Sequence, residues 1–269
     1  MALVAALLTL VGCATSPTGR KQLMLVSNQK MSQLGVEAFS AMGKKGKFAQ
    51  APREQAYATC VAQSLIAVLP PRWRNQNWEV RIIDDDSANA FALPGGRIGV
   101  NRGMFKIATS QDQLATVLGH ELSHVVARHG AERMSDNMAV QGAVLAGTLY
   151  GASRGNDAGR TMAALGLGAE VGILLPFSRT QEAEADTLGQ RYMAEAGFDP
   201  RAAVALWQKM ENKSGGKMPA FLSTHPAPDN RARTLARKAQ QLLPVYRKAR
   251  ANGHQPHCSL QPQSASRDT

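Results

Sequence analysis

Residues 113–128 constrain the fold of this chain most, because they combine helical periodicity with two histidines four residues apart. Apolar residues recur at steps of three and four positions through this segment, which predicts a helix with one face in the hydrophobic core. Ser110, or Asp112 just after it, is of a type that caps a helix N-terminus. His120 and His124 share one face of that helix, so a pair of imidazoles is expected to lie against the core.

The two histidines belong to the pattern His120-Glu121-Leu122-Ser123-His124, or H-E-x-x-H. Imidazoles one turn apart can bind a single metal ion. Glu121 can act as general base toward a water on that metal. The alternative is a solvated helix face that carries two histidines by coincidence. The apolar residues on both sides make that alternative the weaker one.

A third metal ligand is expected from the acidic segment 178–186. Zinc in a hydrolase takes three protein ligands and leaves the fourth position for water. Glu182 and Asp186 are four residues apart and share a helix face, whereas Glu184 is turned away from them. We expect Glu182 to bind the metal and Asp186 to accept the second N–H of a ligand histidine. An acidic, solvated helix face is the alternative interpretation.

Length and charge bound the remaining possibilities. A chain of 269 residues that is 44% hydrophobic can bury one substantial core, and we assign a single catalytic domain to residues 28–243. The formal net charge is +11, but no nucleic-acid recognition motif is present, so no nucleic-acid partner is expected. A basic surface also suits anionic envelope lipids or an acidic partner.

The N-terminus predicts a compartment. Residues 1–12 are apolar and too short to span a membrane, and residues 10–13 resemble a lipobox, after which a signal peptidase cuts and Cys13 is acylated. The segment lacks a basic n-region, which leaves open a start upstream of Met1. Residues 13–27 are interpreted as the lipidated cysteine and a polar tether. Ala14 rather than Asp after Cys13 favours the outer membrane, and an ordinary buried cysteine is the alternative.

The remaining pattern predicts an α+β, mostly helical fold. A small antiparallel sheet is expected before the H-E-x-x-H helix, and nearly everything after it should be helical. The predicted elements are helices at 28–44 and 53–69 and strands at 78–83, 90–93 and 97–100, with a turn at 94–96. Two apolar blocks, Val140 to Tyr150 and Thr161 to Phe177, are expected to be buried or amphipathic helices near the active site, with bilayer contact as an alternative.

The C-terminal residues 244–269 are interpreted as a basic, flexible tail. Cys60 and Cys258 either form a disulfide that ties this tail to an N-terminal helix or remain two free thiols. The sequence leaves both open. His254 and His257 beside Cys258 suggest a second metal cluster, but a mobile tail is favoured.

Four motifs together resemble one family. They are His120-Glu121-x-x-His124, Ser178-Arg179 with Glu182-x-Glu184-Ala185-Asp186, Thr224-His225-Pro226 with Arg231, and residues 89–96. In this order they resemble the HtpX and CAAX-prenyl-protease type of zinc metallopeptidases, peptidase family M48. The resemblance covers residues 28–243 and is strongest to soluble periplasmic lipoprotein members. It implies a gluzincin-type fold with one zinc ion per chain.

Further site residues are expected beside this framework. His225 or Arg231 could stabilise a tetrahedral oxyanion. In a resembling assembly-factor protease, the histidine of this His-Pro loop closes onto zinc as a fourth ligand, so a latch role for His225 stays open, as does a plain loop histidine. The edge strand at Asn89, Ala90 and Phe91 is expected to bind substrate through its backbone, with an ordinary hairpin as the alternative. His129 does not match the third histidine of metzincins and is predicted to be structural.

These expectations describe a zinc-dependent metalloendopeptidase. Its expected substrates are misfolded or damaged envelope proteins, and its expected place is the periplasmic side of a Gram-negative envelope, as an outer-membrane lipoprotein. The first rival is a chaperone-like outer-membrane assembly factor with latched, low proteolytic activity. The second is a non-catalytic adaptor that zinc stabilises.

Overall fold

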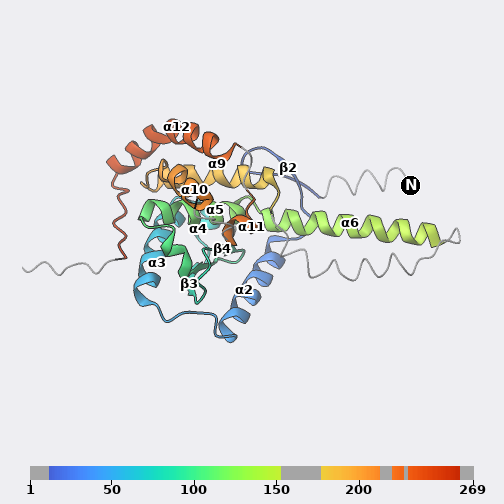
Figure 1. Cartoon of the computed structure of the whole chain (residues 1–269). Helices are drawn as coiled ribbons and strands as arrows, with labels where there is room; N and C mark the ends of the chain where they lie inside the picture. The colour runs from blue at the N-terminus through green and yellow to red at the C-terminus, as the bar shows by residue number, and fades with distance from the viewer. Residues whose placement is uncertain (1–11, 153–176, 213–219, 227–229, 261–269) are drawn as a thin grey trace, which may run out of the picture.

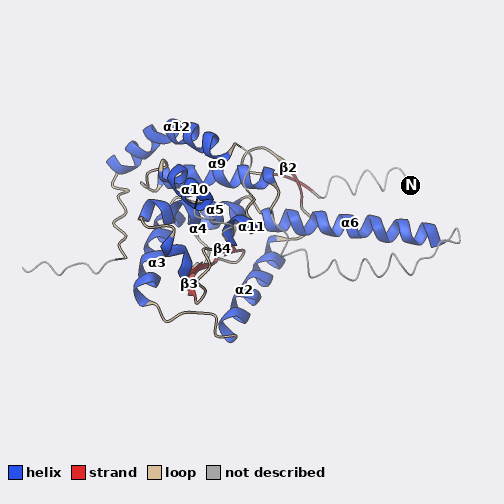
Figure 2. Cartoon of the chain, viewed as in Figure 1, coloured by secondary structure: helices blue, strands red, loops and turns tan. Residues whose placement is uncertain are grey.

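The computed structural model describes residues 12–152, 177–212, 220–226 and 230–260, and helices dominate it (Figure 1, Figure 2). The α+β, mostly helical class is confirmed. The elements are β1 (Cys13–Thr15), β2 (Lys21–Leu23), α2 (Asn28–Lys44), α3 (Pro52–Ile66), α4 (Pro71–Arg74), β3 (Glu79–Ile83), β4 (Ala90–Leu93), β5 (Arg97–Asn101), the 3-10 helix η1 (Arg102–Lys106), α5 (Gln111–Val126), α6 (His129–Ala152), α9 (Arg179–Glu195), α10 (Ala202–Asn212), α11 (Ala220–Thr224) and α12 (Arg231–Ala251).

The sheet before α5 is mixed, so its expected antiparallel topology is only half right. The strand order is β3-β5-β4, with β4 antiparallel to β5 and β3 parallel to it. The hairpin between β4 and β5 turns at Gly95 and Gly96. Their φ angles of 87° and 76° would strain the backbone of any residue that carries a Cβ atom. Because the chain crosses from β3 to the far side of β5 before it forms β4, the first strand pairs in parallel. Strand β4 is left at an edge of this sheet.

Helix α5 is the centre of the molecule. It packs against α9, α3, α10 and β4, and every residue from Leu114 to Val126 is buried. Its N-terminus is capped as expected, since the Ser110 side chain accepts a hydrogen bond from the backbone N–H of Gln113. The helix ends at Val126, with Ala127 as its C-cap, and Arg128, which has a φ of 60°, turns the chain into α6. The H-E-x-x-H motif thus lies on a helix that is buried on all sides by its neighbours.

The residues after Cys13 do not form a solvated tether. Strands β1 and β2 pair as an antiparallel hairpin, with Cys13 opposite Leu23, and β2 packs against α6. Cys13 itself is exposed. Composition suggested a spacer, but these polar side chains have partners elsewhere in the fold. The signal segment expected at residues 1–12 lies outside the described residues, apart from Gly12.

The C-terminal segment is also ordered further than expected. Helix α12 continues past residue 243 to Ala251, with Pro244 inside it, so the expected boundary of the tail is wrong. Cys60 and Cys258 form a disulfide, which settles the choice between a bridge and two thiols. Within the described part of the chain, the one group of potential metal ligands found lies at α5, so His254 and His257 belong to no second cluster there.

Helix α6 extends away from the other described helices (Figure 1). Its apolar residues Val140, Val144 and Leu145 are exposed, so of the two expected arrangements, a buried or an amphipathic helix, burial does not hold for these residues. The second apolar block lies outside the described residues except for Phe177. Among the helices of the described ranges, none combines the length and the apolar character needed to cross a bilayer.

Candidate metal centre

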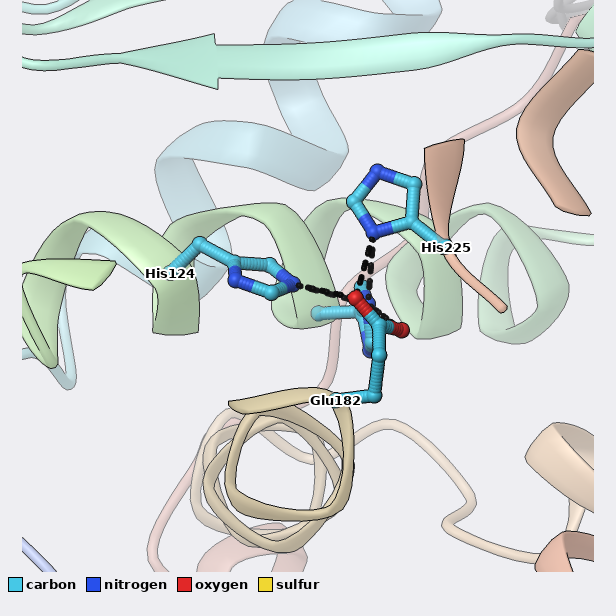
Figure 3. Close-up of side chains that lie close together, drawn as sticks. His124, Glu182 and His225 are labelled. Carbon is cyan, nitrogen blue, oxygen red and sulfur yellow. Dashed lines mark hydrogen bonds and ion pairs between the residues drawn. The ribbon is translucent and has the colours of Figure 1, made fainter. Parts of the chain in front are cut away.

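Four potential ligands from three parts of the chain converge beside α5. His120 and His124 come from α5, Glu182 from α9, and His225 directly follows α11. Their ligand atoms all lie within 4.8 Å of one another, and all four residues are buried. Figure 3 shows the side chains of His124, Glu182 and His225 pointing toward one another.

The distances between these four side chains show that their nitrogen and oxygen atoms face one common point. The Nε2 atoms of His120 and His124 are 3.0 Å apart. Glu182 Oε2 lies 3.2 Å from His120 Nε2, and Glu182 Oε1 lies 3.0 Å from His225 Nδ1. Two imidazole nitrogens and a carboxylate oxygen are the donor set of catalytic zinc sites in hydrolases.

Close packing of two helices brings these donors together. Gly119 of α5 faces Gly189 of α9, and a Cβ atom on Gly189 would lie 2.9 Å from the backbone of Gly119 and His120. Helix α9 begins with a capping box between Ser178 and Gln181. This start places Glu182 in the first turn of α9, opposite the two histidines of α5.

Asp186 lies behind His120, on the side away from the centre. Its Oδ1 is 3.0 Å from His120 Nδ1, which directs Nε2 toward the centre. Arg231 donates to the same Oδ1 at 2.7 Å and lies 3.3 Å above the Trp207 ring. Arg231 is as buried as Glu121 and His225, and its guanidinium is a partner of Asp186 in this structure. Its expected contact with a substrate stays a prediction.

The electrostatics of the centre follow from burial and close partners. Burial lowers the pKa of His120, but the carboxylates of Glu182 and Asp186 outweigh it and raise the pKa to about 9. Burial raises the pKa of Glu182, but the charge on His120 and hydrogen bonds from three histidines lower it overall. For His124 burial dominates and depresses the pKa well below its ordinary value. Glu182 is therefore an anion here, and His124 is neutral.

Glu121 lies next to this group. Its Oε1 is 3.4 Å from His225 Nε2, and burial raises the pKa of its carboxyl against the opposing charges of His225 and His120. Among the described residues, Glu121 Oε1 and Glu182 Oε2 are buried without a hydrogen-bond partner. Buried carboxylate oxygens left open toward converging imidazoles fit a site that holds a cation, so the residues present suit one zinc ion.

Strand β4 runs beside the centre. The strand packs against α5, and a backbone hydrogen bond from Ala92 to the Glu121 carboxylate partly offsets the rise that burial causes in its pKa. Of the expected substrate residues, Ala90 is buried and the Phe91 ring packs across Gly99. Asn89 Oδ1 accepts the backbone N–H of Ala90 at 3.0 Å. At residues 89–91 the side chains are thus engaged within the protein, which leaves the backbone for a contact with a substrate.

A cavity of about 140 Å³ opens on the His124 side of the centre. Its lining includes Leu93 of β4, His124 and Phe177. The Phe177 ring stacks on His124 with 3.9 Å between centroids, and the Arg133 guanidinium lies 4.1 Å from the Phe177 centroid. The sequence reasoning missed Phe177 and Arg133. The position of Phe177 directly before the Ser178-Arg179 motif was the available signal.

Comparison with known proteins agrees with this class of site. Residues 52–239 match the model of Peptidase family M48. The match spans more than half of the chain, and the protein belongs to this family.

Named relatives come from mitochondria and from bacteria. The mitochondrial metalloendopeptidase OMA1 of Schizosaccharomyces pombe is 39% identical over 66% of this chain and 51% of its own length. The OMA1 metalloendopeptidase of Danio rerio is 34% identical over 87% of this chain and 51% of its own length. The beta-barrel assembly-enhancing protease of Yersinia pestis is 34% identical over 61% of this chain and 35% of its own length. The chain thus spans about half or less of the length of these relatives.

Proposed function

We propose that the protein is a zinc-dependent endopeptidase that hydrolyses peptide bonds of misfolded or damaged proteins. The observation that carries this proposal is the buried Glu121 carboxylate, which lies on the same helix as two of the converging donors. Membership of a peptidase family and relatives named as metalloendopeptidases support it.

The proposed mechanism assigns one role to each residue. A zinc ion held by His120, His124 and Glu182 would supply Lewis-acid chemistry and a water of lowered pKa. Glu121 accepts a proton from the attacking water and delivers it to the leaving amine. Asp186 holds the Nδ1–H of His120, so that Nε2 stays directed at the centre.

His225 has two proposed roles that are not exclusive. Beside Glu121 and Glu182 it can donate a hydrogen bond to a developing oxyanion. Its Nδ1 is also 3.3 Å from His120 Nε2, and a fourth ligand at this position would exclude substrate. This position favours a second candidate function, a chaperone-like assembly factor that cuts little while His225 closes the centre. The loop at residues 213–219, before α11, lies outside the described residues.

Substrate would bind along the edge strand β4. An extended peptide can pair with its backbone without regard to side chains, which suits an enzyme for unfolded proteins. The cavity lined by Leu93 and Phe177 would accept an apolar side chain next to the cleaved bond.

We place the protein on the periplasmic side of a Gram-negative envelope membrane, anchored through a lipid on Cys13. Cys13 is exposed, as an acylated residue must be. The Cys60–Cys258 disulfide supports an oxidising compartment. The bacterial relative named for β-barrel assembly supports an outer-membrane setting.

The test is hydrolysis of unfolded casein by the chain from Cys13 onward, with zinc content measured in the same samples. Wild type, Glu121→Gln and His225→Ala are compared, with the exposed Glu37→Gln as the matched control. We expect one zinc per chain in all four proteins and a loss of hydrolysis of about 10²–10⁴-fold in Glu121→Gln, because this variant lacks the proton acceptor.

The outcomes separate the candidates. A faster His225→Ala would support the latch, and a slower one would support stabilisation of the oxyanion. Zinc binding with no cleavage by any variant would contradict the peptidase and favour the assembly factor. No cleavage together with unfolding on zinc removal would favour the adaptor.

A further inference from the structure

The segment of residues 13–25, here called the strap, meets a group of buried polar residues on α6 and α9. These residues are His129, Glu132 and Glu184, each at most 5% exposed. Glu184 points away from the metal centre, as its position on the helix predicts, but it is not solvated. The strap residues Thr18 and Arg20 hydrogen-bond its carboxylate.

A continuous chain of contacts runs from the strap to His124. Thr18 Oγ1 donates to Glu184 Oε1 at 2.7 Å, and Arg20 Nε donates to Glu184 Oε2 at 3.1 Å. Glu184 Oε2 is 3.2 Å from His129 Nε2, and His129 Nδ1 is 2.9 Å from His124 Nδ1. Each link is of hydrogen-bond length.

One arrangement of protons satisfies the whole chain. His124 must keep the lone pair on Nε2 to bind a metal, so its proton is on Nδ1 and is donated to His129 Nδ1. The proton of His129 is then on Nε2 and is donated to Glu184. Glu184 accepts every contact as an anion. The tautomer and the ring orientation of His124 therefore depend on a carboxylate that the strap holds in place.

A second set of contacts fastens the strap to the ends of both donor-bearing helices. Arg20 makes two further hydrogen bonds to Glu132. Gln22 Nε2 donates to Glu132 Oε2 at 3.0 Å and to the Ala127 carbonyl at the end of α5 at 2.9 Å. Gln181, in the first turn of α9, donates to Glu132 Oε2 at 2.8 Å. The strap thus contacts α5, α6 and α9 where they meet.

We propose that the strap is a positioning element of the metal centre, in which Arg20 orients Glu184, Glu184 orients His129, and His129 orients His124. The proposal rests on the proposed function only in that His124 binds zinc. Residues that hold a ligand histidine from behind change metal affinity by about 10–100-fold when they are removed. The competing explanation is that the strap stabilises the fold and has no effect on the centre.

The test measures zinc affinity by competition with a chelator and the visible absorption of the cobalt-loaded protein, on the full chain. Arg20→Ala and Glu184→Gln should each weaken zinc binding about 10–100-fold and shift the cobalt bands, because the His124 ring loses its fixed orientation. The double variant should bind zinc no more weakly than the weaker-binding of the two single variants, because both substitutions act through the same chain of contacts. Arg20→Lys should recover part of the affinity, because an ammonium can still donate to Glu184.

Two further variants keep the test decisive. Arg81→Ala removes an exposed ion pair with Glu79 and should leave zinc affinity and the cobalt spectrum unchanged. Thr18→Val removes an exposed hydroxyl that hydrogen-bonds Glu184 and Ser16. It should lower zinc affinity by a few-fold, even if Arg20→Ala does not fold. Variants that melt at lower temperature but keep wild-type zinc affinity and spectrum would overturn the proposal.

These readouts do not depend on cleavage, so a protein that binds zinc but cuts no peptide would contradict the proposed function and leave the strap test intact.

Discussion

The two histidines of α5 present the same nitrogen to the centre but are held from behind by different groups. Asp186, an anion, lies at Nδ1 of His120, whereas the imidazole of His129 lies at Nδ1 of His124. The carboxylates of Glu182 and Asp186 raise the pKa of His120, and burial lowers that of His124. The site therefore combines one basic and one weakly basic imidazole around a single carboxylate.

Asp186→Asn tests the first of these contacts. The amide keeps the shape but loses the charge that holds His120 and Arg231, so zinc affinity should fall by about 10–100-fold. The dissociation constant measured by chelator competition checks this, with the exposed Asp84→Asn as control. An unchanged constant in Asp186→Asn would show that packing alone orients His120.

Glu132 makes a pH-dependent contribution to stability. Burial raises the pKa of its carboxyl, but hydrogen bonds from Arg20, Gln181 and Gln22 outweigh burial and lower it below the ordinary value of 4.5. A depressed folded-state pKa means that this stabilisation is present above about pH 4.5 and is lost as the pH falls below it. Urea unfolding from about pH 6 to pH 3 should show a steeper loss for wild type than for Glu132→Gln. Parallel curves would contradict this assignment.

At the scale of elements, the contact between α5 and α9 decides whether a centre exists. Three of the four converging donors, His120, His124 and Glu182, lie on these two helices. The helices approach closely where Gly119 faces Gly189. A side chain at this crossing would move Glu182 and Asp186 away from the histidines. The spacing of two backbones thus sets the spacing of the ligands.

Gly189→Ala should lower the free energy of unfolding by about 1–3 kcal/mol, because the methyl group overpacks the crossing. It should also weaken zinc binding. The matched control is Gly142→Ala in α6, where an added Cβ meets nothing within 4 Å and helix propensity predicts a slight gain in stability. Urea unfolding and chelator competition measure both variants. Equal behaviour of the two would show that the helices can separate without cost to the site.

At the scale of the whole molecule, both ends of the described chain are attached to α5 and the helices beside it. The strap joins the N-terminal end to α5, α6 and α9. At the other end, Cys258 is bonded to Cys60 of α3 across a sequence separation of 198 residues. The backbone N–H of Cys258 also donates to Gln111 at the start of α5.

Replacing Cys60 and Cys258 by serine should destabilise the protein by about 2–5 kcal/mol, because the bridge closes a long loop in the unfolded chain. Thermal unfolding of the double variant, and of wild type with a reductant, should show a lower midpoint. Zinc affinity should be retained, since neither cysteine touches the centre. Cys13→Ser is the control, and an unchanged midpoint in the double variant would mean that α12 and its packing already hold this end.

Much of the centre could be predicted from the sequence, because it depends on periodicity within single helices. The four-residue spacing places His120 with His124 and Glu182 with Asp186, and the Ser110 cap sets where α5 begins. Steric preferences between neighbouring residues determine these relations. The family membership follows from the same local motifs.

Only the tertiary structure decided which groups meet across the fold. The parallel pairing of β3 with β5, the burial of Arg231 against Asp186, and the path from Arg20 through Glu184 and His129 all join residues far apart in the chain. A segment such as residues 13–25 has the composition of a solvated tether, yet it is held against the fold because Thr18, Arg20 and Gln22 hydrogen-bond carboxylates on α6 and α9. The sequence by itself determined which side chains share a helix face. Only the tertiary packing decided which distant residues those side chains contact, because a polar side chain is satisfied equally well by water or by a distant residue.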